Sequence, residues 1–75
     1  MLLSDALRTI RQKSFMTQEC FAREMSVTPS TINRWENGKA KPNLTAMKKL
    51  KEFCDNNSLD YALIETAWFD AHVQE

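Results

Sequence analysis

The 75-residue sequence has few of the residues that shape tight turns and bind metals, with one glycine, two prolines, two cysteines and one histidine. The single glycine, Gly38, excludes Gly-rich phosphate loops, dinucleotide-binding fingerprints and most folds rich in β-turns. No stretch approaches the run of about 18 apolar residues that a membrane span needs. The first residues also lack the positive region and apolar run of a secretory signal. We therefore expect a cytoplasmic protein that makes no membrane contact.

The cysteines and the histidine form no recognisable site. Cys20 and Cys54 are far apart, and His72 stands near the end of the chain. These spacings match no zinc site, so we expect no metal and no cofactor. Without a secretory signal, both thiols are expected to be reduced and to serve as small buried or half-buried apolar groups. No nucleophile with a partner histidine and no carboxylate pair indicates catalysis, so we expect no enzyme activity.

The formal net charge is zero, from ten Lys and Arg against ten Asp and Glu. Taken alone, this balance argues against a polyanionic partner. The charges are separated along the chain, however. Residues 1–51 hold ten basic and four acidic residues, a net +6, whereas residues 52–75 hold six acidic and no basic residues, a net −6. The sequence therefore predicts a cationic segment joined to an anionic C-terminal segment.

Helix signals recur along the chain, while no window alternates with the period of two that is typical of a strand. The length allows one domain, and a composition that is 43% hydrophobic excludes a disordered chain. Helix N-caps are predicted at Ser4, Thr17, Thr28 (followed by Pro29), Asn43 and Ser58. The fourth helix would bury Leu44, Met47, Leu50 or Lys51, and Cys54, and the last would run from about 58 to 73. The prediction is a single all-α domain, residues 1–75, made of five compactly packed helices.

Residues 17–38 contain two short capped helices joined by about three or four residues, which is typical of a helix-turn-helix. Ala22 would let the helices cross closely, Asn37 and Gly38 would end the second helix, and its buried anchors would be Val27, Ile32 and Trp35. The outer surface that remains is formed by Thr28, Pro29, Ser30, Asn33 and Arg34. Small polar side chains permit close approach to base edges, and an arginine can bind guanine O6 and N7 together.

A family resemblance covers about two thirds of the chain, from Leu7 to Phe53. It is carried by Thr17-Gln-Glu-Cys-Phe-Ala22, by Val27-Thr-Pro-Ser-Thr-Ile-Asn-Arg-Trp-Glu-Asn-Gly38 and by Pro42. In these residues the chain resembles the phage-repressor helix-turn-helix family (lambda repressor and Cro, XRE-like). The resemblance implies a lambda-repressor-like fold in which helices 2 and 3 form the motif and helix 3 enters the major groove of duplex DNA.

The resemblance also implies roles for single residues. It places base contacts on Thr28, Pro29, Ser30, Asn33 and Arg34, and phosphate contacts on Gln18, Thr31, Asn37, Lys39 and Lys41. Arg11 and Glu36 match a pair that forms a partly buried salt bridge in similar proteins. Pro29 departs from the family pattern by replacing a frequent Gln, and offers an apolar ring to a thymine methyl. Ser26 stands where glycine is frequent, which is tolerable while its backbone stays out of the left-handed region.

The predicted last helix has apolar residues on two nearly opposite sides. One stripe is formed by Leu59, Leu63, Thr66 and Val73, and the other by Tyr61, Ile64, Trp68 and Ala71. One stripe can close the core, and a dimer or partner surface is expected at Tyr61, Ile64, Trp68 and Phe69. A two-fold dimer would set two recognition helices about one DNA turn apart, as a palindromic operator requires. The alternatives are an aromatic stripe folded wholly into the monomer core and an antitoxin-type helix that docks on another protein.

Together these features predict a regulator of transcription that binds double-stranded DNA as a homodimer and acts as a repressor rather than an activator. The resemblance implies a cytoplasmic protein that is encoded by a bacterium, a phage or a plasmid. A net charge of zero is compatible with this role because the cationic segment carries the motif. The competing predictions are a protein-interaction module and a helix-turn-helix fold that has lost DNA binding.

Overall fold

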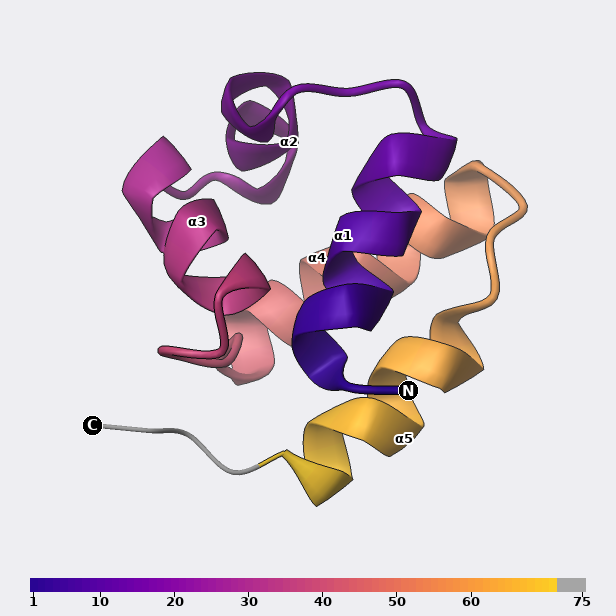
Figure 1. Ribbon diagram of the computed structural model, residues 1–75. Helices are drawn as coiled ribbons and strands as arrows, with labels where there is room; N and C mark the ends of the chain where they lie inside the picture. Colours follow the sequence, from indigo (N-terminus) through magenta and orange to yellow (C-terminus); the bar gives the residue numbers. More distant parts are fainter. Residues whose placement is uncertain (72–75) are drawn as a thin grey trace.

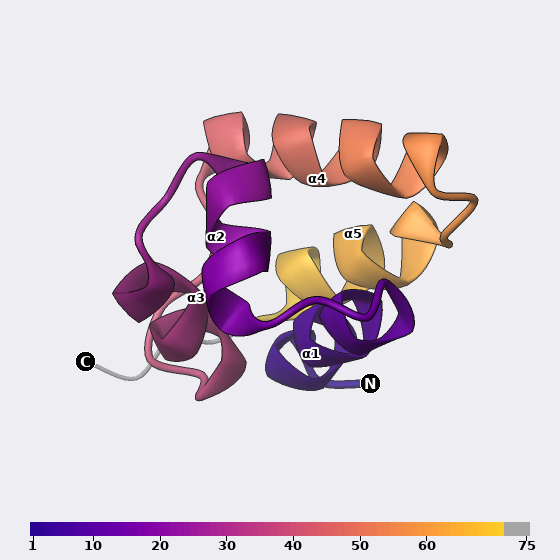
Figure 2. The same cartoon turned by 90° about the horizontal axis from the view of Figure 1, so that it is seen from above.

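Five α-helices and no strand form in residues 1–71, the part of the chain that this computed structural model describes. They are α1 (Leu3–Lys13), α2 (Gln18–Met25), α3 (Pro29–Glu36), α4 (Leu44–Asn56) and α5 (Tyr61–Asp70). α2 and α3 lie at one end of the molecule, and α5 packs against both α1 and α4 (Figures 1 and 2). The predicted all-α class with five helices is confirmed. No helix of residues 1–71 is long and apolar enough to cross a membrane.

Three of the predicted N-caps are confirmed by hydrogen bonds at the helix starts. The side-chain oxygens of Thr17, Thr28 and Asn43 accept from backbone N–H groups three residues later, at 3.1, 3.2 and 2.9 Å. Each bond satisfies one of the donors that the first helical turn leaves without a partner. Pro29 follows in the first turn of α3, where its missing N–H leaves no bond unmade.

The predicted cap at Ser4 is wrong. α1 begins at Leu3, with Leu2 at the N-cap position and no side-chain cap bond. The helix extends to Leu3 because this side chain is buried and belongs to the same core-facing stripe as Leu7.

The predicted start of the last helix at Ser58 is also wrong. Ser58 has φ +55°, which is incompatible with a helix start, and α5 is capped instead by Asp60. The Asp60 carboxylate accepts from the Ala62 N–H at 3.0 Å. The helix ends at Asp70, before the predicted end at 73, and Val73 lies outside the described residues.

The first four helices end in the same way, with one residue in the left-handed region. These residues are Phe15 (φ +56°), Ser26 (+57°), Gly38 (+71°) and Ser58 (+55°). The N–H of the next residue donates each time to a carbonyl five positions back, as in a Schellman motif: Met16 to Arg11, Val27 to Ala22, Lys39 to Arg34 and Leu59 to Cys54. Ser26 therefore does not meet the condition under which serine was expected to be tolerable, because the motif that ends α2 requires a positive φ there.

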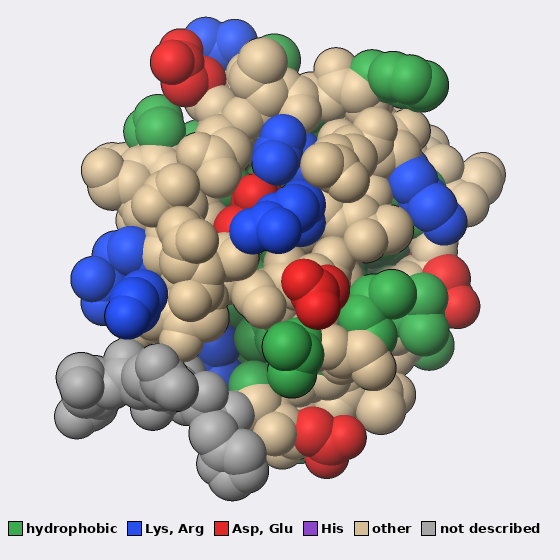
Figure 3. Space-filling view, in the orientation of Figure 1, with side chains coloured by type: hydrophobic (Ala, Val, Ile, Leu, Met, Phe, Trp, Pro, Cys, Tyr) green, Lys and Arg blue, Asp and Glu red, His purple; other side chains and the backbone are tan. Residues whose placement is uncertain are grey.

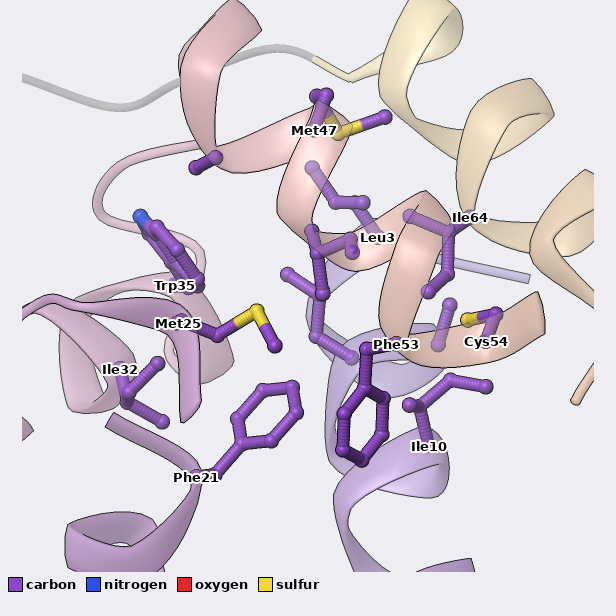
Figure 4. Close-up of a cluster of buried hydrophobic side chains, with 14 of the residues drawn as sticks. Leu3, Ile10, Phe21, Met25, Ile32, Trp35, Met47, Phe53, Cys54 and Ile64 are labelled. Atoms are coloured by element: carbon purple, nitrogen blue, oxygen red, sulfur yellow. The ribbon is translucent and has the colours of Figure 1, made fainter. Parts of the chain in front are cut away.

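The core lies between the helices and takes side chains from all five (Figure 4). Its largest fully buried residues include Leu7, Phe21, Met25, Ile32, Leu50 and Ile64. Phe21 and Phe53 meet edge to face, with ring centroids 5.5 Å apart. α4 contributes the predicted Met47, Leu50 and Cys54. Leu44 is the exception at 71% exposed, because it occupies the first position of α4, at the margin of the core.

α5 corrects the prediction of an exposed aromatic surface. Ile64 is fully buried, so it cannot contact a partner, and Tyr61 and Trp68 are half-buried and pack on the core. The stripe expected to bind another chain therefore closes the core, as in the alternative of a stripe folded into the monomer. With the helix confined to residues 61–70, these positions fall on the side that faces α1 and α4. Only Leu63 (48% exposed) and Phe69 (74%) remain as large apolar side chains on the outer side.

Candidate nucleic-acid interface

α2 and α3 form a helix-turn-helix whose connection spans residues 26–28 (Figure 1). Ala22 in α2 is buried and small, so α3 can pack closely across it. Ile32 and Trp35 are buried on the inner side of α3, and Val27 packs on the core from the connection. These anchors fix which side of α3 faces solvent.

The outer side of α3 carries the five predicted base contacts. All five are exposed: Thr28, Pro29, Ser30, Asn33 and Arg34. The Arg34 guanidinium donates one long hydrogen bond, 3.5 Å, to the Lys39 carbonyl, so it contacts the loop that follows α3. A row of hydroxyl, amide and guanidinium groups on the solvent-exposed side of a helix has the size and the chemistry to read a major groove.

A chain of amide groups crosses from α2 to the end of α3. Gln18 Nε2 donates to Glu36 Oε1 at 3.2 Å, and Asn33 Nδ2 donates to Gln18 Oε1 at 3.4 Å. Asn37 Nδ2 donates in turn to the Asn33 carbonyl (2.8 Å) and to Asn33 Oδ1 (3.1 Å). Gln18 and Asn37, both predicted phosphate contacts, are thereby joined through Asn33, a predicted base contact. These side chains are held in place before any ligand arrives.

Glu36 is the buried anchor of this chain of contacts. Its two carboxylate oxygens accept from Arg11 Nε (2.7 Å) and Nη2 (2.9 Å), which is the pair expected from the sequence. Arg11 Nη1 donates further to the Met16 carbonyl at 3.0 Å. The bidentate pair therefore connects α1 to the end of α3 and to the loop before α2.

The pKa values of this pair reflect its surroundings. Burial by itself raises the pKa of the Glu36 carboxyl, but hydrogen bonds from Arg11 and Gln18 and the charges of Arg11 and Arg8 bring that pKa below its ordinary value. The hydrogen bond to Glu36 raises the pKa of Arg11. Glu36 is thus ionised at neutral pH although its side chain is buried.

Arg8 is a contact that the sequence reasoning missed. Its Nη2 donates to the Glu36 backbone carbonyl at 2.9 Å, and its Nε lies 3.6 Å from Glu36 Oε1. Arg8 and Arg11 are three residues apart in one helix, so they share a face, and this spacing could have indicated a paired site. Two guanidinium groups against one carboxylate leave a local positive charge beside α3.

Two other predicted phosphate contacts are engaged within the molecule. The Thr31 side chain is half-buried, and its hydroxyl oxygen lies 2.9 Å from that of Thr28. Lys39 is exposed, whereas the Lys41 ammonium lies 4.3 Å from the centroid of the Trp68 ring. Trp68 therefore contacts the loop between α3 and α4, a contact that helical periodicity could not reveal.

The charge separation expected from the sequence is visible on the molecular surface. In Figure 3, Lys and Arg side chains lie over α1, α2 and the region of α3, whereas the surface over α5 shows acidic and apolar side chains. Residues 52–71 contain five acidic and no basic residues. On the face shown, the surface over α1, α2 and α3 is thus more cationic than the surface over α5.

Cys20 and Cys54 are both free thiols. Cys20 is half-buried and Cys54 is buried. Burial, aided by the charges of Asp55 and Asp60, raises the pKa of Cys54 to about 11, so this thiol stays protonated. Among residues 1–71, no group of three or more His, Cys, Asp or Glu is arranged to hold a metal ion.

Comparison with known proteins places this geometry in a family. Residues 7–61 match the family model described as helix-turn-helix. The chain is also 32% identical over 53 residues to the HTH-type transcriptional activator BcrR of Enterococcus faecalis. This match covers 71% of the chain but 26% of BcrR, so the chain spans about a quarter of that relative. No solved structure matches significantly. Because the family model takes in α2, α3 and α4 entirely, the chain belongs to the helix-turn-helix family, whose members bind DNA.

Proposed function

We propose that this protein binds double-stranded DNA in the major groove through α3 and regulates transcription. The observation that carries the proposal is the exposed polar side of α3, held in a fixed orientation by the buried Arg11–Glu36 pair. Family membership and the similarity to a transcriptional activator support the same role.

Within this proposal the exposed residues of α3 read bases. Arg34 has the reach and the paired donors to bind a guanine edge, Asn33 can bind an adenine, and the ring of Pro29 can touch a thymine methyl. Thr28 and Ser30 are short enough to let the helix approach the base pairs closely. The phosphate contacts proposed are Gln18, Thr31, Asn37, Lys39 and Lys41, which fix the register of the protein on the duplex.

The decisive experiment is selection of bound DNA from a random pool, followed by a mobility-shift assay on the enriched sequence. We expect an enriched motif containing a guanine, and weaker binding as salt concentration rises. A matched control is the variant Arg23→Ala, which removes an exposed arginine of α2 that lies outside the proposed contacts. No enrichment of any sequence by the folded wild-type protein would overturn the proposal.

We also propose that two copies bind a palindromic site and that binding represses transcription. Symmetric half-sites are the usual target of dimeric helix-turn-helix proteins, and a dimer bound across a promoter can block access of the polymerase. Of the residues of α5 that the sequence predicted for self-association, Phe69 is exposed, and Leu63 on the same helix is exposed as well. Sedimentation with and without the selected DNA tests the dimer, and a reporter gene placed behind that DNA tests the direction of regulation. One copy per DNA molecule would contradict the proposed dimer. Increased expression of the reporter would contradict the proposed repression.

A second candidate function is supported by the same exposed pair. Phe69 is exposed on α5 one helical turn from Glu65 and next to Asp70, Leu63 is exposed elsewhere on the same helix, and the helix has no basic residue. A protein that presents apolar and basic side chains would complement this surface. The experiment is purification from the native host with wild-type and Phe69→Ser chains. A partner retained only by the wild type supports an antitoxin-type role, and identical recovery from both chains argues against it.

A further inference from the structure

All of α5 except its first residue lies beyond residue 61, where the family match ends, yet this helix contacts the loop between α3 and α4. Trp68 Nε1 donates to the Pro42 carbonyl oxygen at 2.6 Å. The ammonium of the preceding residue, Lys41, lies 4.3 Å from the centroid of the same indole ring. The edge and the face of one side chain thus contact two successive loop residues.

The two contacts restrain the loop in different ways. The hydrogen bond fixes the backbone at Pro42, which is itself buried. The other end of the loop is fixed by the Lys39 N–H, which donates to the Arg34 carbonyl at 2.9 Å. The loop that carries Lys39 and Lys41 is therefore held at both ends, by α3 on one side and by α5 on the other.

The cation–π contact also orients the charge of Lys41. The positive charge of the ammonium is attracted to the face of the ring. An N–H group of the same ammonium that is directed away from the ring stays free to donate to another acceptor. Lys41 can therefore bind a phosphate oxygen without leaving Trp68. A lysine held in this way loses less side-chain freedom on binding than one that moves freely in solvent.

We propose that Trp68 is a positioning residue for DNA binding, which holds the loop 39–42 so that Lys39 and Lys41 face the phosphate backbone. This assignment rests on the proposed function. It gives the C-terminal helix a role in the DNA affinity of the domain, although α5 contributes no residue to the proposed contacts with DNA.

The experiment compares duplex binding by the wild type with that by Trp68→Phe and Trp68→Leu. Phenylalanine keeps the ring but removes the N–H donor, and we expect affinity to fall about three- to tenfold on all sequences alike. Leucine removes the ring as well. It should weaken binding further and reduce the slope of log affinity against log salt by about 0.9, the contribution of one phosphate contact. Base preference should not change, because no base contact is altered.

A control separates positioning from stability. Cys54→Ala also removes buried contacts, but Cys54 lies about 15 Å along α4 from the loop end of that helix. We expect this variant to lower the melting temperature and leave DNA affinity unchanged, with all binding measured well below the melting temperatures. A double-mutant cycle with Lys41→Met completes the test, because Trp68→Leu should cost less affinity once the charge of Lys41 is gone.

The outcomes are distinguishable. If Trp68 variants melt earlier but bind every duplex as tightly as the wild type, the positioning role is wrong and the proposed function stands. Fully additive effects of Trp68→Leu and Lys41→Met would overturn the part of the proposal that acts through Lys41. If the wild type itself binds no duplex, the proposed function fails and this assignment fails with it.

Discussion

At the scale of single residues, Glu36 joins three helices. It belongs to α3, accepts two hydrogen bonds from Arg11 of α1 and accepts one from Gln18 of α2. Removing one partner of a buried ion pair leaves the other charge unpaired, which is more costly than the pair itself is stabilising. The orientation of the exposed polar side of α3 therefore depends on the ionisation of one carboxyl group.

The pH dependence of stability follows from the sign of that pKa shift. The pKa of Glu36 in the folded chain lies below its ordinary value of 4.5, so its charged form stabilises the fold above that pH. This contribution is lost as the pH falls through the folded pKa. We expect Glu36→Gln to lower the free energy of unfolding by about 2 kcal/mol at neutral pH and by much less in acid. Urea denaturation over this pH range measures the effect, with Glu24→Gln, an exposed glutamate, as the control. An equal loss at every pH would contradict the role of charge.

Replacing Arg34 by alanine and replacing Lys39 by alanine should weaken DNA binding in different ways. Arg34→Ala should cost about 1–3 kcal/mol on the selected site and relax the preference at one base position, since it removes a bidentate base contact. Lys39→Ala should weaken binding to all sequences alike and reduce the salt slope by about 0.9. Binding titrations on the selected site and on its single-base variants distinguish the two patterns. If Arg34→Ala leaves the base preference intact, Arg34 does not read that position.

At the scale of helices, the scarcity of glycine has a structural cost. Four helices end with a residue in the left-handed region, and only one of these positions is occupied by glycine. For other residues this conformation costs about 1–2 kcal/mol, although Gly loses about 0.5–1 kcal/mol more entropy on folding. Phe15 is the most unfavourable case, because its aromatic side chain is 97% exposed and its backbone is strained.

Replacing Phe15 by glycine should therefore stabilise the domain. The change relieves the left-handed backbone and removes no buried contact, so we expect a gain of about 0.5–1 kcal/mol in the free energy of unfolding. Denaturant melts measure it. Phe15→Ala is the matched control, since it shortens the side chain equally but keeps the strain, and it should give little or no gain. Equal stabilisation by alanine and glycine would show that the exposed ring, and not the backbone, is the source.

The starts of α2, α3 and α4 were predictable from their capping residues, whereas those of α1, which has no side-chain cap, and α5, which Asp60 caps, were not. A local sequence pattern is sufficient to find the caps at Thr17, Thr28 and Asn43. Each of these side chains accepts a hydrogen bond from the backbone N–H three residues later. α1 starts without such a cap because the burial of Leu3 decides its start. α5 is apolar on both sides, and only its packing against α1 and α4 selects the stripe of Ile64 for the core.

The contacts between distant segments were the least predictable. The helix-turn-helix was predictable from its two capped helices and their short connection, and the Arg11–Glu36 pair was found because a known family pattern places it. The bond from Trp68 to Pro42 joins residues 26 positions apart and follows no periodicity. Arg8 was overlooked although its spacing from Arg11 pointed to Glu36. Local signals thus predicted the elements and their exposed polar faces, whereas the contacts that hold the interface in place required the tertiary structure.

At the scale of the whole molecule, a net charge of zero conceals a charge separation. The chain carries +6 over residues 1–51 and −6 over residues 52–75. A polyanion interacts with the face that it meets, and solvent ions screen the acidic remainder within about 10 Å at 0.1 M salt. We therefore expect binding to DNA in spite of the neutral total.

The salt dependence of that binding is a measure of stoichiometry. Lys39 and Lys41 are the two lysines proposed to neutralise phosphates in each copy, so the slope of log affinity against log salt should be about −2 for one bound copy and about −4 for a dimer. Titrations over a range of salt concentrations give the slope. A slope near zero would show that these lysines do not neutralise phosphates.

The different burial of the two cysteines allows unfolding to be followed by thiol modification, without an added label. Cys54 is fully buried with a pKa raised to about 11, so a thiol reagent can modify it only when the core opens. Cys20 is half-buried on α2 and needs no such opening. The rate of modification at Cys54 therefore reports the free energy of opening under native conditions, while Cys20 records reagent access in the same molecule. Bound DNA should slow modification of Cys54 by a factor whose logarithm is proportional to the stability that the ligand adds.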